Sequence, residues 1–66
     1  MFKNLFLRYD KLFVLSNLEL KNIDELKEII SKKINIKSNY FYLICNNKLL
    51  LSIDNLNDND NINIFR

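Results

Sequence analysis

Few side chains in this sequence could take part in chemistry at neutral pH, and they do not form a catalytic pattern. Histidine is absent, so the usual acid–base residue and a common zinc ligand are missing. Glycine is also absent, which excludes a glycine-rich phosphate-binding loop. Cys45 is the only cysteine, and it has no histidine or second cysteine to activate it as a nucleophile. We therefore predict that Cys45 is a plain strand or core residue and that the chain is not an enzyme.

Three aspartates late in the chain resemble a calcium-binding loop in composition alone. Asp54, Asp58 and Asp60 alternate with asparagines, but the glycine and the twelfth-position glutamate of such a loop are missing. No metal and no cofactor are expected, and neither is a small-molecule substrate.

The length and composition indicate one small domain over residues 1–66. The chain is 48% apolar, which is enough for one core, although a domain of this size buries only about 60% of its unfolded surface. A single cysteine cannot form an internal disulfide, so we infer a reducing compartment and expect the cytoplasm. The apolar runs fall short of the roughly 18 residues that a membrane span needs, so no membrane contact is expected.

The apolar pattern predicts one helix and five strands. Short apolar or alternating runs are typical of strands, and twelve asparagines supply turn residues in a chain without glycine. The helix is expected at residues 23–34. The strands are expected at about residues 4–8, 12–15, 40–45, 48–51 and 62–65.

The helix carries the clearest local signals. Asn22 is a good N-cap, and Glu25 follows at capping-box spacing. Asn35 can take the left-handed conformation that ends a helix. An apolar stripe at helical spacing should pack on the sheet; its members are Ile23, Leu26, Ile30 and Ile34, widened by Ile29. The fold class is therefore predicted as α+β, in the order β-β-α-β-β-β, with a mixed sheet packed on one helix.

This order and several local motifs resemble the ubiquitin-like β-grasp family over about residues 4–66. The motifs that carry the resemblance are Asn4-Leu5-Phe6-Leu7-Arg8, Ile23-x-x-Leu26-Lys27-x-x-Ile30, Leu43-Ile44-x-x-x-Lys48-x-Leu50, Leu56-Asn57-Asp58 and Ile62-Asn63-Ile64-Phe65-Arg66. The short first hairpin makes the chain most similar to the ubiquitin-like domain fused to a small-subunit ribosomal protein. The resemblance implies that Leu56 opens a short helical turn. The sequence ends at Arg66 without the Gly-Gly tail of conjugated modifiers, so it implies a non-conjugating binding module.

Strand alternation places two apolar groups on the sheet face away from the helix. Leu43 should face the core and Ile44 should face outward. The first group of predicted partner-binding residues is Ile44, Phe65, Leu49 and Tyr42; the second is Phe6, Leu12 and Val14. Contiguous exposed apolar residues usually mark interfaces. The alternatives are that drift has left apolar residues on the surface, that the strand register is shifted by one, or that the last strand pairs differently and buries the second group.

The basic residues suggest a further contact. Arg8, Lys32, Lys33 and Lys37 are candidates for contacting RNA or an acidic partner. The alternative for the three lysines is a solvated helix end whose charges complement the helix dipole. By resemblance, Lys48 is a weak candidate for accepting a modifier.

The sequence thus predicts non-catalytic protein binding. We expect a small docked structural subunit of a ribosome or another ribonucleoprotein assembly, in contact with its protein subunits and in possible contact with ribosomal RNA. The alternative is a soluble adaptor that mimics ubiquitin through a patch centred on Ile44. A modifier or sulfur carrier would need a tail beyond Arg66.

Overall fold

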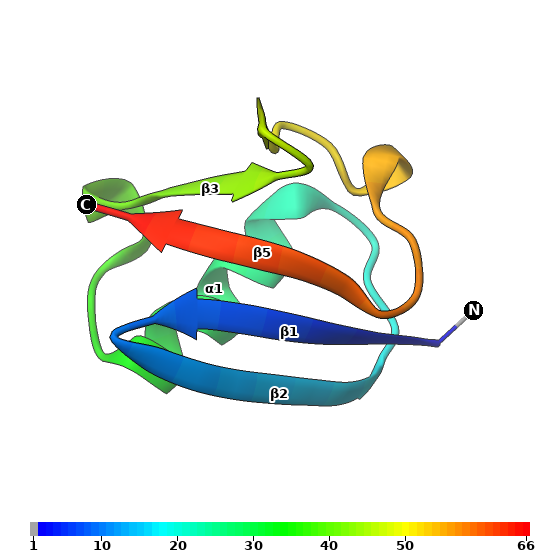
Figure 1. Cartoon of the computed structure of the whole chain (residues 1–66), viewed down its shortest axis with the longest axis horizontal. Helices are drawn as coiled ribbons and strands as arrows, with labels where there is room; N and C mark the ends of the chain where they lie inside the picture. Colours follow the sequence, from blue (N-terminus) through cyan, green and yellow to red (C-terminus); the bar gives the residue numbers. More distant parts are fainter. Residues whose placement is uncertain (1) are drawn as a thin grey trace.

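The computed structural model describes residues 2–66, in which one α-helix packs on a five-stranded mixed sheet (Figure 1). In chain order the elements are β1 (Lys3–Tyr9), β2 (Lys11–Leu18), α1 (Ile23–Ile34), a 3-10 helix (Ser38–Tyr40), β3 (Tyr42–Cys45), β4 (Lys48–Leu49), a second 3-10 helix (Ile53–Asn55) and β5 (Asp60–Phe65). The predicted α+β class, with one helix and a mixed five-stranded sheet, is confirmed.

The strands lie in the order β2-β1-β5-β3-β4. The central strands β1 and β5 are parallel, whereas the other neighbouring pairs are antiparallel. Figure 1 shows α1 behind the sheet, and it shows the start of β1 and the end of β5 at opposite sides of the molecule. The helix thus covers one face of the sheet, called the inner face here. The opposite face is called the outer face.

The core forms between α1 and the inner face. Leu26 and Ile30 of the helix are fully buried, as are Leu5 and Leu7 of β1 and Ile62 of β5. Burying each such side chain contributes roughly 1.5–3 kcal/mol. The other stripe residues pack half-buried at its margin; they are Ile23, Ile29 and Ile34. The predicted apolar stripe of the helix is confirmed.

Both ends of α1 are fixed by asparagine. The Asn22 side chain accepts a hydrogen bond from the Glu25 amide at 2.9 Å. The Glu25 carboxylate accepts one from the Lys21 amide at 3.3 Å, one residue before the N–H used in a complete capping box. At the other end Asn35 is left-handed, with φ 62° and ψ 41°, and donates to the Ser31 carbonyl at 2.8 Å. The predicted helix boundaries are confirmed.

Asparagine also makes the turns. The described non-glycine residues with positive φ are Asp10, Asn17, Asn35, Asn46, Asn47 and Asn59. Asn46 and Asn47, with φ 54° and 65°, form the two-residue turn between β3 and β4. Positive φ at both positions matches the twist of a tight hairpin. The predicted turn between these two strands is confirmed.

Three local predictions were wrong in detail. Tyr40 belongs to a 3-10 helix rather than to β3, because its amide donates to the Lys37 carbonyl at 3.0 Å. β4 ends at Leu49, although the amide of the buried Leu50 still donates to the Leu43 carbonyl at 2.8 Å. The short helical turn precedes Leu56 rather than starting there, because the Ser52 hydroxyl caps Ile53–Asn55 by accepting from the Asp54 amide at 3.2 Å.

Candidate functional site

The outer face of the sheet is the main candidate surface. Strand register aligns one residue from each strand in a row across it, in the order Leu12, Arg8, Asn63, Ile44 and Leu49. With neighbouring strands about 4.8 Å apart, this row is roughly 19 Å wide. Within it, apolar residues stand at both ends and polar residues in the middle.

The first apolar group, the hairpin cluster, consists of Phe6, Leu12 and Val14. Phe6 of β1 lies directly opposite Val14 of β2. Leu12 and Val14 are each 52% exposed, while Phe6 is half-buried. The last strand pairs with β1 and β3 and leaves this cluster uncovered, which excludes the alternative that β5 buries it.

The second apolar group, the Ile44 cluster, consists of Tyr42, Ile44, Leu49 and Phe65. The rings of Tyr42 and Phe65 stack with their centroids 5.7 Å apart. These two residues and Leu49 are nearly half exposed. Ile44 is only half-buried rather than fully open, because β3 has β5 on one side and β4 on the other.

The predicted strand register at Ile44 is confirmed. Leu43 faces the core and is 1% exposed, whereas Ile44 lies opposite Asn63 and Leu49 on the outer face. A one-residue shift would have reversed these positions. The four residues of the Ile44 cluster therefore lie together on the outer face of the sheet.

The polar middle of the outer face holds one cation. Arg8 is exposed and lies between Leu12 and Asn63 in the register. Asn61 lies opposite Phe6 and continues the polar strip. The charge of Arg8 thus stands between the hairpin cluster and the Ile44 cluster.

The predicted basic residues do not form one surface. Lys32 and Lys33 are exposed in the last turn of α1, and Lys37 is exposed soon after it. The helix lies on the inner side of the sheet, whereas Arg8 lies on the outer face. An RNA or acidic partner would therefore have to reach around the molecule to contact all four residues. Lys48 is exposed at the start of β4.

Cys45 is a buried strand residue, as predicted. It is 5% exposed, and its thiol Sγ lies 3.7 Å from Oδ2 of Asp60. Burial raises the pKa of the Cys45 thiol, and the adjacent Asp60 carboxylate raises that pKa further through its charge and hydrogen bond. The thiol therefore stays protonated at neutral pH, which makes it a poor nucleophile.

The aspartates near the C-terminus hold a loop in place. The Asp58 carboxylate accepts from the Asn4 amide at 2.7 Å, and the Asp60 carboxylate accepts from the Asn57 amide at 2.8 Å. The carbonyl of Asn4 in turn accepts from the Asn59 amide at 2.7 Å. Among residues 2–66, no three His, Cys, Asp or Glu side chains lie together as a metal site would require.

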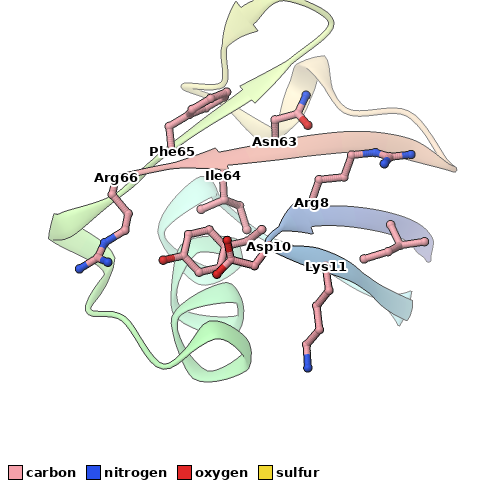
Figure 2. Close-up of a pocket in the computed structure, with 9 residues that line it drawn as sticks. Arg8, Asp10, Lys11, Asn63, Ile64, Phe65 and Arg66 are labelled. Carbon is pink, nitrogen blue, oxygen red and sulfur yellow. The ribbon is translucent and has the colours of Figure 1, made fainter.

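An open hollow of about 690 Å³ lies at the tip of the first hairpin and is called the hairpin-end hollow here (Figure 2); it was not predicted from the sequence. It lies between the β1–β2 turn and the last residues of β5, and Arg8, Lys11 and Arg66 are among its lining residues. The hollow lies where the chain turns back at Asp10 while β5 continues to Phe65 beside β3. Only the relative lengths of the paired strands could have revealed it.

No protein-family model matches this chain, and no curated protein matches it significantly in sequence. In the part of the chain that the structure describes, no helix is long and apolar enough to cross a membrane.

Proposed function

We propose that this chain is a non-catalytic binding module of the ubiquitin-like β-grasp type, docked through the outer face of its sheet onto a protein surface in a larger cytoplasmic assembly. One observation carries the proposal: two apolar clusters stand on the same uncovered face. Large exposed apolar patches are uncommon on soluble monomers and usually mark interfaces. A protein partner fits, because it can cover apolar groups and pair a carboxylate with Arg8 between them.

The distribution of the clusters favours a docked subunit. They lie at opposite ends of a row that crosses all five strands, so one partner would cover the sheet from β2 to β4. Arg8 and the asparagines between them would set the orientation of the partner, since polar groups within an interface contribute specificity. The specific assembly we propose is a ribosome or another ribonucleoprotein. Support for it comes from the similarity of the short hairpin to the ribosome-linked member of the family, with RNA contact assigned to the exposed lysines around the end of α1.

A second candidate is an adaptor that mimics ubiquitin. The support for it is the Ile44 cluster, in which the Tyr42–Phe65 stack stands beside Ile44 and Leu49. This candidate would use the Ile44 cluster alone and would leave Leu12 and Val14 of the hairpin cluster exposed to water. Substitution of Leu12 separates the two candidates, because only the docked subunit needs it.

The test is the sedimentation of the native chain. A salt-washed extract of the source cells is separated on a density gradient, and each fraction is probed with an antibody against the chain. A docked subunit should migrate with a particle in the megadalton range, and nuclease treatment should shift it if the particle contains RNA. A free peak at the chain mass of 8.0 kDa would contradict the proposal. The adaptor would instead appear in smaller complexes that are insensitive to nuclease.

A further inference from the structure

β5 continues beyond its last residue pair with β1. β1 and β5 pair only as far as Arg8 and Asn63, and the chain turns back at Asp10 with φ 60°. On its other side, β5 continues to pair with β3 as far as Phe65. β1 ends at Tyr9, which the register places beside Ile64, and Phe65 pairs with Tyr42 of β3, so within the described residues the hairpin side of β5 lacks a neighbouring strand only after Ile64. The hairpin-end hollow occupies this position.

The hairpin-end hollow is surrounded by positive charge. Arg8, Lys11 and Arg66 line it, and Asp10 is the only acidic residue in its lining. All four side chains are exposed, so they can reorient toward a ligand. Counting side chains alone, three cations and one carboxylate give the lining a charge of +2, equal to the formal side-chain charge of the whole chain.

The cations do not converge on one point. Figure 2 shows Arg66 at one side of the hollow and Arg8 at the other, while Lys11 points away from both. A compact anion such as phosphate would contact only one of them at a time. A ligand that satisfies all three must be extended and must carry several separated negative charges.

We propose that the hairpin-end hollow binds an extended acidic segment of a partner protein, which lies in line with β1 and continues its pairing along β5. An extended peptide can add to an open strand edge through main-chain hydrogen bonds, while its side chains determine specificity. Successive side chains of such a segment alternate between the two faces of the sheet. Its carboxylates would meet Arg8 on the outer face and the more peripheral Lys11 and Arg66.

A protein segment fits this hollow better than a nucleic acid does. The Phe65 backbone pairs with Tyr42, so by strand alternation the backbone of Arg66 lies on the hairpin side, where it can pair with a peptide backbone. Leu12 and Phe65, half-exposed apolar residues of the outer-face clusters, also line the hollow and provide contacts for apolar side chains. Tyr9 is the only aromatic residue besides Phe65 in the lining. The hollow shares Arg8, Leu12 and Phe65 with the outer face, so this inference rests on the proposed function and assigns the acidic segment to the docked partner.

The experiment is a binding titration with the whole chain. The probe is a fluorescein-labelled peptide of about eight residues in which glutamate alternates with valine, a pattern that favours an extended strand. Anisotropy is measured at about 50 mM salt, where exposed ion pairs are weakly screened. Two further probes are the same peptide with every glutamate replaced by glutamine, and a labelled uridine oligonucleotide of similar length.

Two double variants make the comparison site-specific. Arg8→Gln with Arg66→Gln removes two cations from the hollow, and Lys32→Gln with Lys33→Gln removes two from the end of α1. Each lowers the net charge from +2 to 0, because two positive charges are lost. We expect the first variant to bind the acidic peptide about tenfold more weakly, since each exposed ion pair contributes roughly two- to fivefold. The second should bind within about twofold of the unchanged chain.

Amide chemical shifts locate the bound peptide. The acidic peptide should shift the Asp10, Ile64 and Phe65 amides and leave the helix amides in place. Equal binding of the glutamine peptide would overturn the proposal, as would equal weakening by the two double variants. Tighter binding of the oligonucleotide, with loss in the Arg8 and Arg66 variant, would assign the hollow to nucleic acid instead.

Discussion

The packing of α1 on the sheet can be tested at Leu26. Its side chain is fully buried in the core, at 0% exposure. Replacing it with alanine removes three carbon atoms and leaves a cavity that the surrounding strands only partly fill. Such substitutions lower the free energy of unfolding by about 2–5 kcal/mol. A domain of this length has a total stability of roughly 3–10 kcal/mol, so the loss takes a large share of it.

The assay is urea unfolding followed by far-ultraviolet circular dichroism, with thermal unfolding alongside. For a loss of about 3 kcal/mol, the melting temperature should fall by roughly 10–25 °C, because each kcal/mol shifts it by about 4–8 °C at this size. Ile29→Ala, at a half-buried position of the same helix, should cost about 1 kcal/mol. Lys33→Ala, at an exposed position, should stay within about 0.5 kcal/mol. If Leu26→Ala behaves like Lys33→Ala, the stripe of α1 does not form the core and the reasoning fails.

Three further predictions concern caps and titration. Asn22→Ala should lower the free energy of unfolding by about 1 kcal/mol by removing the bond to the Glu25 amide, and an unchanged urea midpoint would contradict this. Asn35→Gly should stabilise the protein and Asn35→Ala should destabilise it by about 1–2 kcal/mol, since φ is 62° there; the reverse order would refute the left-handed C-cap. Because the pKa of the Cys45 thiol is raised, the folded state keeps a proton at high pH that the unfolded state loses. The contribution of the thiol to the free energy of unfolding is therefore complete below the ordinary thiol pKa of 9.0 and is lost as the pH rises above it. Urea unfolding from about pH 8 to pH 10 should therefore show a steeper loss of stability for the native chain than for Cys45→Val, and parallel curves would exclude this effect.

The features that could be predicted from the sequence depend on neighbouring residues. Both ends of α1 follow from side chains within one turn of them, namely the Asn22 cap and the left-handed Asn35. The orientation of Ile44 follows from strand alternation beside the buried Leu43. The turn at Asn46 follows from the two adjacent asparagines, which tolerate positive φ.

The features that could not be predicted depend on contacts between distant segments. β4 ends at Leu49 and Leu51 is exposed, although Leu49, Leu50 and Leu51 look alike in the sequence. The hairpin-end hollow depends on where β1 stops relative to β5, and these strands are far apart in the chain. The basic residues looked like one group in the sequence, but the sheet separates Arg8 from the lysines at the end of α1.

The outer face can also be tested by placing a charge in each apolar cluster. Leu12→Lys with Leu49→Lys puts one lysine in the hairpin cluster and one in the Ile44 cluster, at positions 52% and 49% exposed. Asn39→Lys with Asn55→Lys adds the same charge at exposed positions outside both clusters. Both variants should fold, because substitutions at exposed positions usually change stability by within about 0.5 kcal/mol.

The most direct measurement is the sedimentation of these two variants when each is expressed in the source cells in place of the native chain. If the outer face is the docking surface, the cluster variant should leave the megadalton fractions and appear as a free chain, while the control variant stays in them. Retention of the cluster variant in the heavy fractions, with both variants folded by circular dichroism, would contradict docking through this face.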